Sequence, residues 1–117
     1  MKKSDPLWIA CDKLCGEATR LRDNGICRIC GKPGSDPHHI IPRAYAGTTF
    51  MLENRLWVCR KCHSNEVGLQ DRCVAVIGLP EFYILYEIAQ SVTQLRKSDL
   101  LAIREKLTAL KTAFLTT

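Results

Sequence analysis

Two Cys-x-x-Cys pairs constrain the fold of this 117-residue chain more than any other feature of its sequence. The first pair is Cys27 and Cys30, and the second pair is Cys59 and Cys62. Each Cys-x-x-Cys turn presents two thiolates to one tetrahedral ion, and two turns complete the closed shell that is usual for structural zinc. Thiolates are soft ligands, which disfavours magnesium and calcium. We therefore predict a structural Zn²⁺ ion that stabilises the fold and leaves no coordination position open for chemistry.

A disulfide framework is the competing interpretation of the cysteines. The chain has an odd number of cysteines, seven, and the segment 1–6 is not followed by the long apolar stretch of a secretory signal. We expect a cytoplasmic protein with reduced thiols, which favours metal binding. No membrane partner is expected, because the longest apolar run, 73–79, is too short to span a bilayer. Cys11, Cys15 and Cys73 are predicted to be small core residues.

Helix signals flank the cysteine-rich segment on both sides. A first helix is expected from a cap at Ser4 or Asp5, with Pro6 in its first turn, to a stop at 24–25. Apolar residues at helical spacing predict three later helices, over 69–77, from Pro80 to about 95, and from a cap at Ser98 to about 114. The last two stripes suggest an antiparallel helical hairpin. Burial within the core is the favoured role of these stripes, and a dimer interface is the alternative.

The middle of the chain is interrupted by glycine and proline, so an apolar core there requires a staple. Short strands are expected over 38–41 and 55–58, and a helix begins near Cys62. These elements predict an α+β fold in a single domain, 1–117. It comprises an N-terminal helix (1–25), a zinc-stapled core (26–67) and a helical extension (68–117).

All three histidines of the chain lie beside the cysteine pairs. His38 and His39 follow the first pair, and His63 directly follows the second pair. An imidazole serves both as a metal ligand and as a general base near neutral pH. Adjacent residues on a regular strand point to opposite faces, however. Either the irregular turn around Pro37 adjusts the direction of His38 and His39, or one of them is not a ligand.

The run His38-His39-Ile40-Ile41-Pro42-Arg43, then Asn54 and then Cys59-x-x-Cys62-His63, resembles the motif of the HNH endonucleases. The resemblance covers about residues 27–66 and implies a ββα-metal core that hydrolyses phosphodiester bonds in DNA. It implies His39 as the general base and His38 and His63 as ligands of one catalytic divalent cation, Mg²⁺, Mn²⁺, Ni²⁺ or Co²⁺. Asn54 is expected to orient His39 through its amide. Many family members have Asp where His38 stands, and histidine softens the site toward the last three metals.

DNA is the expected partner, and the formal net charge of +5 is compatible with a polyanion. Arg43, Arg60 and Lys61 are candidate phosphate contacts, although a solvated surface is the ordinary role for such residues. A homodimer is compatible with cutting both strands. A weaker similarity over 20–31 and the helical tail resembles the lambda Rap (NinG) recombination endonucleases. It implies branched DNA as substrate and a phage or prophage origin in a bacterial host cell.

Two other functions compete with the nuclease. A non-catalytic zinc-containing nucleic-acid-binding module accounts for the four cysteines and for the positive charge. A protein-interaction module with a zinc staple accounts for the helical tail. Neither alternative gives a role to the three histidines and Asn54, so the endonuclease is the favoured function.

Overall fold

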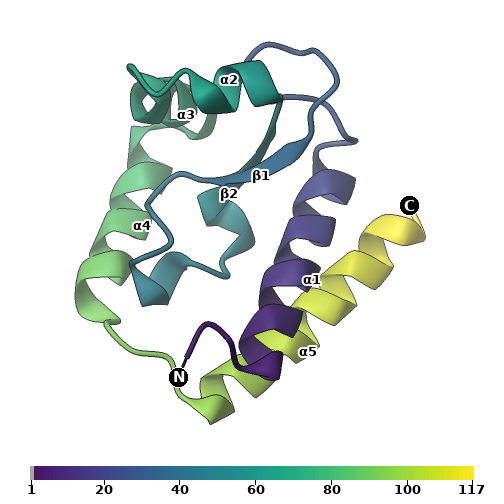
Figure 1. Cartoon of the computed structure of the whole chain (residues 1–117), viewed down its shortest axis with the longest axis vertical. Coiled ribbons are helices and arrows are strands. Elements are labelled where there is room, and N and C mark those ends of the chain that lie inside the picture. Colours follow the sequence, from purple (N-terminus) through teal and green to yellow (C-terminus); the bar gives the residue numbers. More distant parts are fainter. Residues whose placement is uncertain (1) are drawn as a thin grey trace.

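A computed structural model describes residues 2–117, so that Met1, the first residue of the predicted segment 1–25, lies outside the described part. Its elements are α1 (Pro6–Arg22), β1 (Asp36–His39), the 3₁₀ turns η1 (Ala46–Thr48) and η2 (Leu52–Asn54), β2 (Arg55–Val58), α2 (Arg60–Ser64), α3 (Leu69–Ile77), α4 (Leu79–Ser91) and α5 (Lys97–Leu115). The small sheet lies in the middle of the molecule, with α2, α3 and α4 on one side and α1 and α5 on the other (Figure 1). The fold is α+β, as predicted.

Helix α1 begins and ends where its sequence signals predict. Asp5 is the N-cap, and its Oδ1 accepts a hydrogen bond from the Leu7 amide at 2.8 Å. After the helix, Asn24 and Gly25 have φ angles of 55° and 69°, the left-handed conformation that stops a helix. Its buried face carries Cys11 and Cys15, both with no exposed surface. The predicted core role of these two cysteines is confirmed.

Strands β1 and β2 form a two-stranded antiparallel sheet in which Asp36 pairs with Val58 and His39 pairs with Arg55. Strand β2 spans the predicted residues, but the prediction of a strand over 38–41 is wrong in its second half. The strand begins at Asp36 and ends at His39. Beyond it, the Ile41 amide donates to the side chain of Asn54 instead of a strand partner, and Pro42 follows.

Helices α3 and α4 meet at Gly78, whose φ of 91° ends α3 at the predicted position. Helix α4 ends at Ser91, so the expectation that this helix continues to about 95 is wrong. The α4 residues Leu85 and Ala89 are buried against Ile41, which packs α4 beside the end of β1. Cys73 of α3 is fully buried near Leu56 and Val58, as predicted for a core cysteine.

Helix α5 packs along α1, which corrects the predicted hairpin with α4 (Figure 1). Leu100 shares a buried cluster with Cys11 and Phe50, and Lys111 Nζ lies 2.6 Å from Glu17 Oε2. Ser98 is not the N-cap of α5. That position belongs to Arg96, whose amide donates to the Asp99 carboxylate at 2.7 Å.

No single helix within residues 2–117 is long and apolar enough to cross a membrane. Helices α3 and α4 reach the required length and hydropathy only as a pair, and that pair is bent by 113°.

Candidate metal centres and active site

The two Cys-x-x-Cys pairs come together at one point. The sulfur atoms of Cys27, Cys30, Cys59 and Cys62 all lie within 4.8 Å of one another. Cys59 is the N-cap of α2, whereas Cys27 follows the turn after α1. Gly31 directly after the first pair has a φ of 78°, which glycine adopts without strain. This tetrad can hold a metal ion such as zinc, and its four soft thiolates fit a closed structural site.

Backbone amides favour the thiolate form of two of the four cysteines. The Cys30 amide lies 3.5 Å from Cys27 Sγ, and the Cys62 amide lies 3.4 Å from Cys59 Sγ. Although burial opposes ionisation of Cys27, backbone amides, that of Cys30 first, lower its pKa to about 6, and the Cys62 amide lowers the pKa of Cys59. Burial and the neighbouring thiols raise the pKa of Cys62, so metal binding must displace the proton of this fourth thiol.

The three histidines also converge. His38, His39 and His63 all line one open pocket of about 280 Å³, together with Glu66 and Gln70. His38 and His39 are neighbours, and neighbours on a regular strand point to opposite faces. His39 is the last residue of β1, however, and at this end of the strand both side chains reach the pocket. The rings of His38 and His63 have centroids 5.0 Å apart. Two imidazoles that bind one ion through bonds of about 2.1 Å place their centroids about 5 Å apart, so the spacing of these two rings is compatible with a shared divalent cation.

His63 is held by an acidic residue that the sequence analysis did not identify. His63 Nδ1 lies 2.9 Å from Asp36 Oδ2, which leaves Nε2 of His63 available as a ligand. The hydrogen bond from His63, aided by Arg60, holds the pKa of Asp36 below its usual range. A carboxylate that orients a histidine in this way is the common outer shell of a metal site. The available signal was the position of Asp36 two residues before His38, on the same face of a strand.

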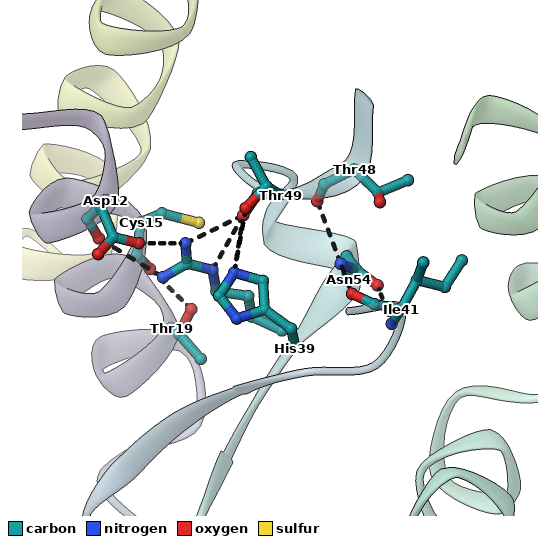
Figure 2. Close-up of polar contacts among 9 residues, drawn as sticks. Asp12, Cys15, Thr19, His39, Ile41, Thr48, Thr49 and Asn54 are labelled. Carbon is teal, nitrogen blue, oxygen red and sulfur yellow. Dashed lines mark hydrogen bonds and ion pairs between the residues drawn. The ribbon is translucent and has the colours of Figure 1, made fainter. Parts of the chain in front are cut away.

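His39 is fixed in one tautomer by a main-chain carbonyl. Its Nε2 lies 3.1 Å from the carbonyl oxygen of Thr49, which can only accept a hydrogen bond (Figure 2). Nε2 therefore carries the proton and Nδ1 is free in the neutral ring. Burial, together with the charge of Arg55, lowers the pKa of His39 to about 4. Burial and the neighbouring His63 lower the pKa of His38 to about 4 as well.

The Thr49 carbonyl is also bound by Arg55, which the sequence analysis missed. Arg55 Nε and Nη2 donate to this oxygen at 3.2 and 3.0 Å, and Nη2 lies 2.6 Å from Asp12 Oδ1 of α1. Arg55 is 1% exposed and lies opposite His39 in the sheet. Arginine is rarely buried unless it is paired. The available signal was a charge within an otherwise apolar strand.

Asn54 joins the end of β1 to the loop that carries Thr49. Its Oδ1 accepts from the Ile41 amide at 2.8 Å, and its Nδ2 donates to the carbonyls of Ile41 and Thr48 at 3.0 and 3.2 Å (Figure 2). The side chain is fully buried. Asn54 therefore fixes the residue next to Thr49, the residue whose carbonyl binds His39.

The three candidate phosphate contacts lie in different places. Arg43 is exposed and borders two pockets that His39 also borders. Arg60 instead forms a two-point contact with Asp36, at 3.1 and 3.2 Å. Lys61 lies on the cysteine side of α2, next to Cys59 and Cys62, and does not border the histidine pocket. Of the three residues, only Arg43 is both beside His39 and free of a described ion pair.

Comparison with known families gives one match: residues 27–67 fit the model of the HNH endonuclease family. The match supports the HNH family. The matched segment contains both cysteine pairs, the three histidines and Asn54, and it leaves out α1, α3, α4 and α5. No curated protein and no solved structure matches the chain. The HNH segment thus carries the cysteine and histidine sites, whereas Asp12 lies outside it.

Proposed function

We propose that this protein is a metal-dependent HNH endonuclease that hydrolyses phosphodiester bonds in DNA. The observation that carries the proposal is the convergence of His38, His39 and His63 on one pocket inside the segment that fits the HNH model. A binding module needs the cysteine staple and the positive charge but has no use for three histidines around one pocket. We therefore favour catalysis over binding alone.

His39 acts as the general base. Its free Nδ1 takes a proton from the attacking water, and the oxygen of that water forms a bond to phosphorus. The bond from phosphorus to the 3′ oxygen then breaks, its electron pair stays on that oxygen, and the oxygen takes a proton from solvent water, which leaves a 5′-phosphate and a 3′-hydroxyl. The proton on Nε2 stays there and keeps its hydrogen bond to the Thr49 carbonyl, so the ring keeps its direction as it becomes a cation. Asn54 orients His39 indirectly, through the backbone of Thr48.

His38 and His63 hold the divalent cation, with Asp36 fixing the ring of His63. An ion held there would neutralise negative charge that develops on the phosphate and on the leaving oxygen. Two nitrogen ligands would leave room for water and for phosphate oxygens. They also favour Mn²⁺, Ni²⁺ or Co²⁺ over Mg²⁺ relative to a site with a carboxylate in place of His38. The four cysteines hold a separate structural zinc ion.

Branched DNA is the substrate that we propose within this class, on the similarity of residues 20–31 and the helical tail to the phage Rap (NinG) enzymes. A dimer would supply two sites for cutting two strands of such a junction. Faster cleavage of a four-way junction than of a linear duplex, together with a dimeric mass in solution, is the expected result. Equal rates on both substrates would contradict the preference for branched DNA.

A cleavage screen tests the proposal. The protein is incubated with supercoiled plasmid and with a synthetic four-way junction in Mg²⁺, Mn²⁺, Ni²⁺ or Co²⁺, with a chelator control. We expect cleavage that requires an added divalent cation and leaves 5′-phosphate ends. Binding of DNA without cleavage in any metal would favour the binding module instead.

A further inference from the structure

We propose that helix α1 forms one wall of the groove that receives the sugar-phosphate backbone of the nucleic acid, with Lys13, Arg20 and Arg43 as phosphate contacts. The proposal rests on the nuclease function above and assigns a substrate role to a helix outside the HNH segment. The groove is an open cleft of about 410 Å³ between α1 and the sheet. Its lining includes His39 and His63, so it leads to the proposed reaction centre.

The geometry of α1 brings it close to the sheet at this cleft. Gly16 faces Pro37, and a Cβ atom at that position would lie 3.4 Å from the ring of Pro37, in van der Waals contact. The helix therefore lies directly against β1 at this point. Asp12 anchors the same stretch of α1 through Arg55, and Glu17 anchors it to α5 through Lys111. One wall of the cleft is thus helix α1, which is fixed to the sheet on one side and to α5 on the other.

Each acidic residue that lines the cleft is neutralised by a partner. Asp12 lies 2.6 Å from Arg55, and Glu17 lies 2.6 Å from Lys111. Asp36 is bound by Arg60 and His63. These carboxylates therefore do not present unpaired negative charge to a polyanion.

The basic residues of the cleft, in contrast to the acidic ones, have no ion-pair partner. Lys13, Arg20 and Arg43 are exposed, and their side chains form no ion pair or hydrogen bond with any of residues 2–117. Lys13 and Arg20 are separated by two turns of α1, roughly 10 Å. That distance matches about three phosphate steps along one strand. The cleft thus offers free cations along its length and no free acid, which suits a phosphate backbone and gives no base-specific contact.

Equilibrium binding without cleavage tests this groove. A labelled four-way junction and a linear duplex are titrated with protein in a chelator that leaves the structural zinc in place, and fluorescence anisotropy is recorded at several salt concentrations. For the double variant Lys13→Ala, Arg20→Ala we expect about tenfold weaker binding. The slope of log Kd against log salt should fall by about 1 for each cation removed.

Two controls keep the result specific. Lys97→Ala removes one exposed lysine at the start of α5, away from the cleft, and should bind as tightly as the wild type. The charge-retaining variant Lys13→Arg, Arg20→Lys should also bind normally. Zinc content and circular dichroism check that each variant is folded. Unchanged Kd and salt slope in the alanine double variant would overturn the groove. Failure of the wild type to bind or cut DNA would instead reject the nuclease function.

Discussion

Arg55 is a buried charge that joins α1 to the proposed general base. Its guanidinium donates to the Thr49 carbonyl, the oxygen that also binds His39 Nε2, while Asp12 supplies the opposite charge. A buried charge costs free energy unless it is paired and hydrogen-bonded. Arg55 and His39 therefore bind the same Thr49 carbonyl oxygen, and Asp12 holds Arg55 in place. A shift of that carbonyl would move His39.

Substitution of Arg55 tests this positioning role. Arg55→Met removes both hydrogen bonds to Thr49, so His39 loses its fixed direction. We expect the cleavage rate at saturating metal to fall about a hundredfold, the cost of a small misplacement of a reacting group. Arg55→Lys, which restores one donor and the charge, should recover part of the rate. Loss of the single His39 Nε2–H tautomer in the ¹⁵N spectrum of Arg55→Met is the matching spectroscopic result, and a wild-type spectrum and rate would contradict the role.

Asn54 carries the second prediction at this scale. Asn54→Ala leaves the buried amide and carbonyl of Ile41 without a partner, and the carbonyl of Thr48 keeps only the Met51 amide. We expect the free energy of unfolding to fall by about 2 to 4 kcal/mol, because each unsatisfied buried group is costly. Urea denaturation of the zinc-loaded protein measures it. Asn65→Ala, at an exposed asparagine, is the matched control and should change stability little. Equal stability of the two variants would contradict the proposed bridge.

At the scale of elements, β1 and α2 are joined by the contact of Asp36 with His63 and Arg60. This contact sets the ring of His63 relative to His38, which follows Asp36 by two residues on the same strand. Strand β1 and helix α2 therefore meet at the proposed cation site through the Asp36 carboxylate. This carboxylate acts on His63 and is not itself proposed as a ligand.

Removal of the Asp36 carboxylate should weaken cation binding. Asp36→Ala is expected to reduce the affinity of the histidine site for Mn²⁺ by about 10- to 100-fold, as for other outer-shell partners. Calorimetric titration of the zinc-loaded protein measures this affinity. Asp71→Ala on α3 removes an acid outside the groove and serves as the control. Wild-type affinity in Asp36→Ala would show that His63 needs no such support.

Local signals predicted most elements but not their partners. The caps around α1, the stop at Gly78 and strand β2 were encoded by residues at their own positions. The end of β1 was not, because it depends on the Asn54 side chain replacing a strand partner. The stripe on α5 indicated a buried face but not that α1 would cover it. The candidate site was likewise predictable only where its signal is local. The cysteine tetrad followed from the spacing of the cysteines. Asp12, Asp36 and Arg55 were not predicted, because they act through contacts between segments that are distant in the sequence.

For the whole molecule, the cysteine tetrad joins the turn after α1 to helix α2. Three small buried clusters take the place of one large core, and one of them packs directly against the tetrad. The histidine site is built from β1 and α2, so its shape depends on the tetrad being closed. We therefore infer that structural metal is required for the catalytic site to form.

Two cysteine substitutions distinguish the effect of the structural metal on stability from the effect of ordinary core packing. Cys59→Ala is expected to abolish bound zinc and cooperative unfolding, because binding of a structural metal is coupled to folding. Cys73→Ala also removes a buried cysteine but should keep zinc and a cooperative, somewhat weaker transition. Zinc content by mass spectrometry and thermal unfolding distinguish the two. Retention of zinc by Cys59→Ala would contradict the assigned tetrad.

We propose His39 as the general base of a divalent-cation-dependent nuclease. The most direct measurement compares wild type with His39→Ala on one labelled DNA junction at saturating Mn²⁺, after zinc content and DNA affinity have been matched. We predict cleavage by the wild type with 5′-phosphate products, and a reaction at least a hundredfold slower for the variant. Equal cleavage by both proteins, or cleavage by neither with any of the four divalent cations, would contradict it.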